Sequence, residues 1–332
     1  MASYQKTAPG VWSGRIDGTD LDLLRWHQII ELSEPAILPD LEKGQQGIAF
    51  IGFCCDEGVR RNNGRVGAGD GPQTIRNYCG NFPVVADHIR LIDAGDVYCK
   101  DGDLGKAQTL LADKLAEIVN AGYLPIVLGG GQELSYGTFQ SLKPKQEGLE
   151  YGIINFDAHF DLRAIKPEEP AHSGSWVWQV QNDCKNAGIP FHYLALGIQQ
   201  YSNTRRLFEL AIEMGAPYFL AEHFTSDQLE NILKTINGII ANSDVLHLAI
   251  DMDVFAAPYA PGVSAAGYNG ISPNAMFKRL LRHVVLSGKV AAIDIAEVNP
   301  SLDTDNRTSR LAAAFIFDIV QAADINAEYP TP

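Results

Sequence analysis

Short apolar runs recur along the chain, and their hydrophobic character is nearly continuous rather than alternating. They cover residues 47–53, 124–129, 151–157, 193–197, 245–251 and 289–295. Continuous apolar runs are typical of strands covered on both faces, because neither face of such a strand meets water. The runs therefore predict strands of a buried, mainly parallel sheet.

Helical patterns fall between these runs. Residues 104–120 carry apolar side chains at helical spacing, and residues 307–322 predict a mostly buried last helix. Thr225 and Ser226 are expected to cap a helix over 227–236. Ser272 is expected to cap another helix, which Pro273 opens and which runs to about 286.

The alternation of strands and helices defines the expected fold class. It predicts right-handed βαβ units and a three-layer α/β arrangement, with a mostly parallel central sheet between helices. No linker, repeat or low-complexity tract interrupts the sequence. We therefore expect a single domain over residues 1–332, with an N-terminal extension of about 1–45.

Composition excludes several classes of partner. The net charge is −14 and no basic run is present, which argues against nucleic-acid binding. No apolar run reaches the roughly 18–20 residues that span a bilayer, and the N-terminus lacks the pattern of a secretory signal. Five scattered cysteines without a CxxC pair suit reduced thiols in a cytoplasmic protein. The oligomeric state stays open, a homo-oligomer included.

Chemistry-bearing residues gather where three of the predicted strands end. The first group is Asp157, His159 and Asp161, and the second is Asp251 and Asp253. Residues two apart in an extended chain share a face, so each group can point into one site. Gly129-Gly130-Gly131 forms a flexible turn that can aim Gln132 or Glu133 inward.

A single acid at a strand end more often caps the next helix or solvates a loop. Four aspartates and one histidine on two strand ends favour a metal site instead, because converging carboxylates repel one another without cations. A carboxylate-rich set with one imidazole and no thiolate favours manganese ahead of zinc. Four negative charges balance two divalent cations, which would lower the pKa of a shared water and support hydrolysis.

Four motifs carry a resemblance to a known family. They read LGGGQE at 128–133, NFDAHFD at 155–161, AIDMDVFAAPYAPG at 249–262 and DIAEVNP at 294–300. In type and order they resemble the signatures of the ureohydrolases, the arginase family of binuclear manganese hydrolases. The N-terminal third, including CDEGVRRNNGRVGAGDGP at 55–72, is most similar to formimidoylglutamases, which hydrolyse N-formimino-L-glutamate to L-glutamate and formamide during histidine degradation.

The resemblance implies roles for individual residues. Asp157 and Asp251 would bridge two manganese ions, Gln132 and Asp161 would complete the first site, and His159 and Asp253 would complete the second. Asp161 would also assist proton transfer. Glu297 would hold the nitrogen substituents of the amidine carbon. The dicarboxylate substrate needs local cations on an acidic protein, and the candidates lie in motif segments near the expected mouth of the site: Arg60, Arg61, Arg65 and Arg163.

Three departures from the family pattern qualify the resemblance. Gln132 stands where most members have histidine, so the first metal site is expected to be weak. Ala249 replaces the serine of the S-x-D-x-D motif, and His172 precedes the position of the usual proton-relaying histidine by one residue. We interpret His172 as a surface residue.

Two alternatives therefore remain open beside a formimidoylglutamase. One is a hydrolase of another amidine or guanidino acid, and the other is a metal-poor relative without catalysis.

Overall fold

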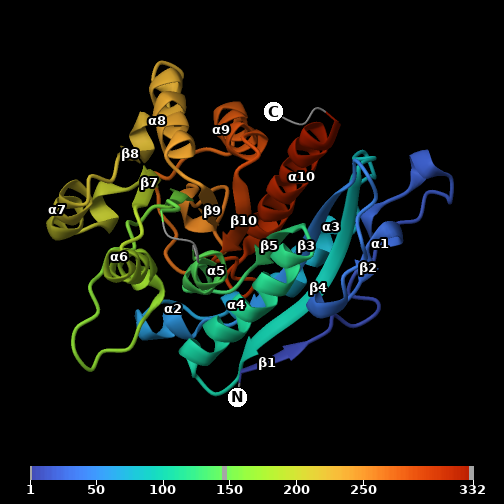
Figure 1. The fold of residues 1–332 in the computed structure, drawn as a ribbon, viewed down its shortest axis with the longest axis horizontal. Coiled ribbons are helices and arrows are strands. Elements are labelled where there is room, and N and C mark those ends of the chain that lie inside the picture. The colour runs from blue at the N-terminus through green and yellow to red at the C-terminus, as the bar shows by residue number, and fades with distance from the viewer. Residues whose placement is uncertain (1, 144–147, 329–332) are drawn as a thin grey trace.

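Ten strands of the described chain form one sheet, in the order β1-β4-β3-β5-β10-β9-β6-β7-β8, with β2 beside β4 (Figure 1). The structure is a computed structural model and describes residues 2–143 and 148–328. The strands are β1 (Ala2–Gln5), β2 (Glu31–Leu32), β3 (Gln46–Cys54), β4 (Ile89–Cys99), β5 (Tyr123–Leu128), β6 (Tyr151–Phe156), β7 (Phe191–Ile198), β8 (Tyr218–Leu220), β9 (Val245–Asp251) and β10 (Val290–Ala296). Every pairing is parallel except that of β1 with β4.

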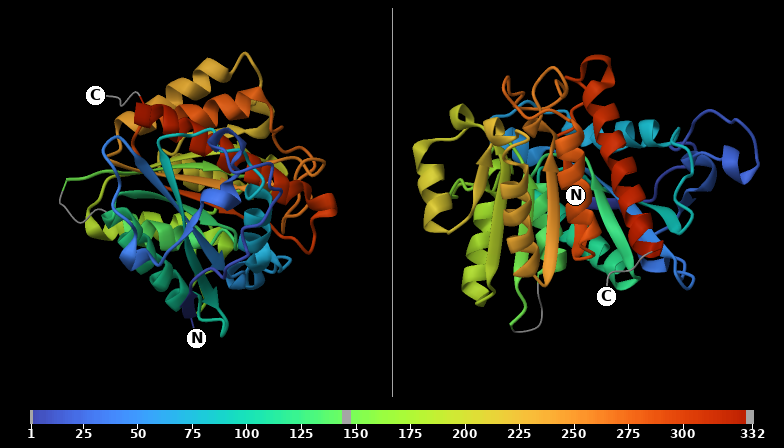
Figure 2. Two further views of the ribbon diagram at one scale, coloured as in Figure 1. Left: turned by 90° about the vertical axis from the view of Figure 1, so that its right-hand side faces the viewer. Right: turned by 90° about the horizontal axis from the view of Figure 1, so that it is seen from above.

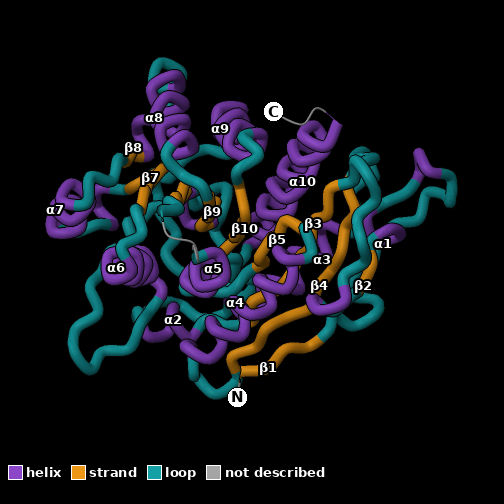
Figure 3. The backbone as a smooth tube through the Cα atoms, in the orientation of Figure 1, coloured by secondary structure: helices purple, strands orange, loops and turns teal. Residues whose placement is uncertain are grey.

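Helices cover both faces of this sheet. They are α1 (Trp26–Ile29), α2 (Glu57–Arg61), α3 (Gly71–Cys79), α4 (Leu104–Asn120), α5 (Leu134–Leu142), α6 (Trp176–Ala187), α7 (Arg205–Glu213), α8 (Leu229–Ala241), α9 (Ala275–Leu286) and α10 (Arg307–Glu328). Helices α3, α8, α9 and α10 lie on one face, whereas α4, α5 and α6 lie on the other (Figures 1 and 3). The predicted mainly parallel sheet between two helical layers is confirmed. No helix among the described residues is long and apolar enough to cross a bilayer.

The central strands are buried on both faces, as their continuous apolar sequences predict. All six residues of β6 are buried, and β9 is buried from its second residue onward. The view from above in Figure 2 shows the neighbouring strands running side by side next to α10. Their carboxyl ends therefore meet at one edge of the sheet, where the loops carry the candidate chemistry.

Two predicted helix starts are wrong. Helix α9 begins at Ala275 rather than at Pro273, because the side chain of Asn274 accepts hydrogen bonds from the backbone N–H groups of Met276 and Phe277. Helix α8 begins at Leu229 and follows Gln228, not the pair of hydroxyl residues at 225 and 226.

The longest strand, β4, was not predicted, since acids interrupt its apolar residues. Asp93 is fully buried, and Asp96 is nearly so. Arg76 of α3 neutralises both, with Nε 2.7 Å from Asp93 Oδ2 and Nη1 2.6 Å from Asp96 Oδ1. Trp12 also donates its Nε1–H to Asp93, which fastens the N-terminal segment to the sheet.

Candidate metal centre

Four adjacent strands position the candidate site. The sheet places β5, β10, β9 and β6 next to one another, and the loops that follow them carry Gln132, Glu297, the 251–253 pair and the 157–161 group. Ligands bind beyond the carboxyl ends of strands in folds of this kind. Segments up to 165 residues apart in sequence come together here, since the backbone N–H of Gln132 donates to Glu297 Oε1 at 3.0 Å.

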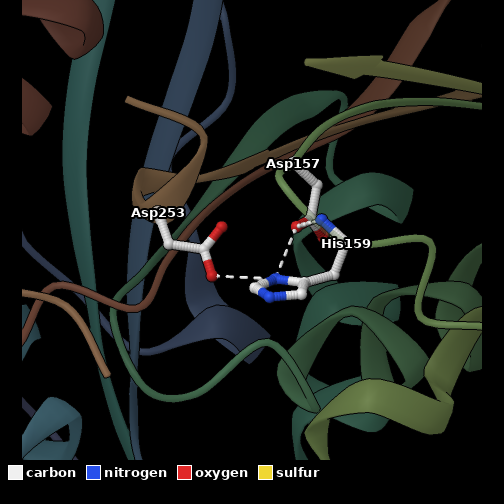
Figure 4. Close-up of side chains that lie close together, drawn as sticks. All are labelled: Asp157, His159 and Asp253. Carbon is white, nitrogen blue, oxygen red and sulfur yellow. Dashed lines mark hydrogen bonds and ion pairs between the residues drawn. The ribbon is translucent and has the colours of Figure 1, made fainter. Parts of the chain in front are cut away.

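Asp157, His159 and Asp253 form a compact group (Figure 4). His159 Nδ1 lies 3.0 Å from Asp253 Oδ2 and 3.4 Å from Asp157 Oδ1. One ligand atom from each residue falls within 4.8 Å of the others, which is close enough to hold one metal ion. Both carboxylates are buried and the imidazole is partly exposed. This group can therefore bind a cation that approaches from the side of the partly exposed imidazole.

Backbone hydrogen bonds hold these carboxylates in place. Asp157 Oδ1 accepts from the N–H of His159 at 2.6 Å, and Asp251 Oδ1 accepts from the N–H of Asp253 at 2.7 Å. Asp253 Oδ1 accepts from the N–H of Ala158 at 3.3 Å, which joins the end of β9 to the end of β6. Asp157 and Asp251 each bond to the backbone N–H two residues ahead in the chain. The i, i+2 spacing that predicted a shared face therefore also fixes the orientation of these carboxylates.

The electrostatics show a cluster that lacks positive charge. Burial, followed by the carboxylate of Asp253, raises the pKa of Asp157 to about 6. Burial and neighbouring carboxylates also raise the pKa values of Asp161 and Asp251 well above the ordinary value. Burial opposes the charge on His159, but Asp253 and Asp157 outweigh it and raise the pKa of the imidazole. A divalent cation would relieve this repulsion.

Gln132 reaches the site from the glycine turn after β5. Gly130 has φ +76°, and a Cβ there would lie 2.5 Å from the carbonyl oxygen of Phe53, so the turn requires glycine. Gln132 Nε2 donates to Ser135 Oγ at 3.2 Å, whereas its buried Oε1 has no hydrogen-bond partner within residues 2–143 and 148–328. Glu133 turns away from the cavity and accepts the N–H of Gly58 at 2.7 Å.

Asp161 and Glu297 share an unusual backbone conformation. Both lie in the left-handed region, at φ +51° and +65°, which non-glycine residues rarely adopt. Asp161 Oδ2 accepts the Nε1–H of Trp176 at 2.7 Å, and this fixes one oxygen of the carboxylate. Glu297 Oε2 is buried and has no partner in the described part of the chain, so it remains available to a ligand. Burial and Glu133 raise the pKa of Glu297.

These residues surround a cavity of about 290 Å³. Six of the predicted site residues line it on the acidic side: Gln132, His159, Asp161, Asp251, Asp253 and Glu297. Asp157 does not line the cavity: its side chain is 1% exposed, and its Oδ1 lies 3.4 Å from Nδ1 of the cavity residue His159. The cavity thus gathers the acids that the strand ends predicted.

The four predicted arginines separate into two groups. Arg65 and Arg163 line the cavity, but Arg60 and Arg61 do not. Arg60 pairs with Glu57, while Arg61 binds Glu57 and the carbonyl oxygens of Ala171 and Gly102. Arg61 therefore joins α2 to the loops at 102 and 171, whereas Arg60 pairs with Glu57 inside the same helix. The structure does not bring either of these two predicted substrate ligands to the cavity.

The two cavity arginines also differ. Arg65 donates to the carbonyl oxygens of Ser264 and Val263 at 2.8 Å each. The side chain of Arg163 is exposed, and no side-chain hydrogen bond or ion pair holds it among the described residues. Arg163 therefore offers a guanidinium group to whatever enters the cavity.

Several residues of the cavity wall were not predicted. Asn62, Ser173 and Asn203 line it, and Asn62 Nδ2 donates to Ser173 Oγ at 3.1 Å. Trp176, which binds Asp161, was also missed, because a tryptophan in an amphipathic segment gives no sign of a polar contact. His172 is half-buried rather than on the surface and does not line the cavity; burial and Arg163 lower its pKa.

Comparisons with known proteins agree with this geometry. A model described as the arginase family matches residues 46–321. The formimidoylglutamase of Aeromonas hydrophila is 40% identical over 325 residues, covering 97% of this chain and 100% of the relative. That of Chromobacterium violaceum is 40% identical over 312 residues, covering 93% and 96%.

Solved structures show a similar fold. The formimidoylglutamase of Bacillus subtilis matches with a TM-score of 0.76 and 21% identity, covering 96% of each chain. The formiminoglutamase of Trypanosoma cruzi, in a structure with two Mn²⁺, matches with a TM-score of 0.72 and 22% identity, covering 85% of this chain and 95% of that one.

Proposed function

The chain belongs to the arginase family, and on this premise we propose that it is a formimidoylglutamase, which hydrolyses the amidine C–N bond of N-formimino-L-glutamate to give L-glutamate and formamide. The observation that carries the proposal is the cavity itself. It contains both an acid-rich cluster able to hold metal and the guanidinium group of Arg163, which has no partner among the described residues. Full-length relatives at about 40% identity support this choice within the family.

The donor set fits divalent manganese. Carboxylate and amide oxygens with one imidazole match the preferences of that ion, and no thiol of the described residues lines the cavity. The buried, unpartnered Oε1 of Gln132 is a further sign of a missing ligand, because such oxygens are costly to leave unbonded.

We propose that these residues would hold two manganese ions as the family resemblance implies. Asp157 and Asp251 would be shared, Gln132 and Asp161 would serve the first ion, and His159 and Asp253 would serve the second. Gln132 is the weak member, since a neutral amide oxygen binds manganese less strongly than imidazole does.

Manganese bound there would lower the pKa of a water molecule and supply the nucleophile for hydrolysis. Side chains of the cavity would bind the amidine group and transfer the proton. Glu297 keeps Oε1 on the backbone of Gln132 and presents Oε2 to the N–H groups of the amidine carbon. Asp161 has one oxygen held by Trp176, so its other oxygen can accept a proton and pass it to the departing amine.

Arginine side chains at the cavity can bind the carboxylates of the substrate. A chain of net charge −14 repels a dicarboxylate at long range, so binding requires a local cation. Arg163 can form a bidentate pair with one carboxylate, because its guanidinium group is not engaged elsewhere in the described chain. Arg65 is already bonded to two carbonyl oxygens and adds positive charge at the rim.

A product assay separates the proposal from its alternatives. The manganese-loaded protein would be given formiminoglutamate, arginine and agmatine, with formamide and urea measured as products. We expect formamide from formiminoglutamate and at least about a hundredfold lower kcat/KM on the guanidino compounds, which corresponds to roughly 3 kcal/mol of discrimination. Comparable urea release would indicate a guanidino hydrolase. Little bound manganese and no turnover of any compound would indicate the metal-poor relative without catalysis.

Metal analysis tests the ligand assignment separately. His159→Ala and Asp253→Ala should each remove the more tightly bound manganese, because each deletes a ligand that is not shared. Unchanged manganese content in both variants would show that the assignment is wrong.

A further inference from the structure

Cys55 and Cys99 lie at the ends of two neighbouring parallel strands. The register pairs Phe53 with Val97 and Cys54 with Tyr98, and Cys55 and Cys99 are the residues that follow this last pair. Neighbouring strands are about 4.8 Å apart, which lies inside the Cα separation of about 4.4–6.8 Å that a disulfide spans. The side chain of Cys99 packs on the core cluster that contains Cys55. The two thiols therefore lie at the ends of neighbouring strands whose spacing a disulfide can span.

The two thiols are not equivalent. Cys55 is 3% exposed and donates a hydrogen bond to the sulfur of Cys99, which is partly exposed. This bond lowers the pKa of Cys99, although burial and the charge of Asp101 act in the opposite direction. The same bond and burial raise the pKa of Cys55. Cys99 is thus the accessible thiol that forms the thiolate, and Cys55 is a protected partner that keeps its proton.

We propose that Cys55 and Cys99 form a reversible dithiol–disulfide site that reacts with small disulfides of the glutathione type. The Cys99 thiolate attacks one sulfur of the small disulfide, so a mixed S–S bond forms and the first small thiolate leaves and takes up a proton. The Cys55 sulfur then attacks the Cys99 sulfur, the second small thiol leaves with the Cys55 proton, and the protein disulfide forms. Two protein thiols are oxidised and one small disulfide is reduced to two thiols. Excess small thiol reverses both steps.

The site is separate from the hydrolytic chemistry but adjoins it. The carbonyl oxygen of Cys55 accepts the N–H of Gly131 at 3.0 Å, within the turn that precedes Gln132. Neither cysteine lines the cavity. The proposal therefore does not depend on the identity of the substrate, and its test can fail or succeed without regard to hydrolysis.

Peptide mapping tests the proposal on the full-length protein. The protein would be equilibrated in glutathione buffers from fully reduced to fully oxidised, alkylated and digested with trypsin. The expected product joins the peptide over 44–60 to the peptide over 91–100, and it should disappear again in reduced buffer. The variant Cys99→Ser should lose this product, whereas Cys54→Ser and Cys184→Ser should retain it. Absence of the linked peptide from wild type in oxidised buffer would overturn the proposal, as would its loss in Cys54→Ser.

A second measurement needs no variant. In reduced wild-type protein, iodoacetamide should label Cys99 roughly tenfold or more faster than Cys184, because only the thiolate reacts and Cys184 is buried with a raised pKa. Equal rates at the two positions would contradict the assignment of Cys99 as the attacking thiol.

Discussion

Removing metal should make this protein more stable in mild acid than at neutral pH, and Asp157 sets the size of the effect. Its pKa rises from 3.8 to about 6 on folding. Because one pKa unit corresponds to about 1.4 kcal/mol, ionised Asp157 destabilises the metal-free fold by roughly 3 kcal/mol at pH 7. This penalty declines as the pH falls through 6 and is absent below 3.8. Between pH 7.5 and pH 5, about 1.4 kcal/mol is recovered.

Neighbouring groups act in the same direction. The raised pKa values of Asp161 and Asp251 add penalties of the same sign at neutral pH. His159 has a raised pKa, so the stability it contributes is complete below about 6.5 and is lost as the pH rises through its folded value. Glu57, whose pKa is lowered by Arg60, stays largely ionised at pH 5 and does not oppose the trend.

Urea unfolding at pH 5 and pH 7.5, after treatment with a chelator, measures this difference directly. Saturating manganese should reverse the order, because protons compete with the metal for the same ligands. Asp253→Asn should shrink the difference in the metal-free protein, whereas the matched change Asp113→Asn on the exposed face of α4 should leave it intact. A metal-free protein that loses stability from pH 7.5 to pH 5 would refute the reasoning.

Three substitutions test individual side chains. Gln132→His should raise the manganese retained per chain after dialysis, since imidazole is the stronger ligand; equal retention would show that Gln132 does not limit the site. Arg163→Met should raise KM for formiminoglutamate roughly tenfold or more while kcat changes little, and Arg60→Met, which alters a residue outside the cavity, should leave KM alone. Trp176→Phe should lower kcat about tenfold or more by freeing Asp161, an effect that Trp178→Phe should not reproduce.

The sequence predicted which acids lie close together for a definite physical reason. Buried parallel strands need nearly unbroken apolar residues, so the points where polar residues resume mark the strand ends. Asp157 and Asp251 stand at two such points, and the geometry of a parallel sheet brings those points together. The pattern was visible because it depends only on local sequence and on a general rule of the fold.

The missed features depend on contacts between distant segments. Strand β4 contains Asp93 and Asp96, and its burial is possible only because Arg76 of another element neutralises them. Contacts between distant segments also decide which of the predicted arginines are free to bind a ligand. Arg61 binds the carbonyl oxygens of Gly102 and Ala171, whereas Arg163, in an equally suggestive motif, has no partner in the described part of the chain. Sequence spacing does not reveal which of two cations is already engaged.

The left-handed conformation of Asp161 and Glu297 has a consequence for the evolution of the family. Each residue holds a backbone geometry that costs about 1–3 kcal/mol and that glycine or asparagine adopts more readily. If both acids serve hydrolysis as proposed above, selection for activity keeps them at these positions against this cost, as is common where activity and stability conflict. A lineage released from that selection can gain stability at either position by a single substitution. Glycine or asparagine at these two positions is therefore an expected signature of descendants that have kept the fold and abandoned the reaction.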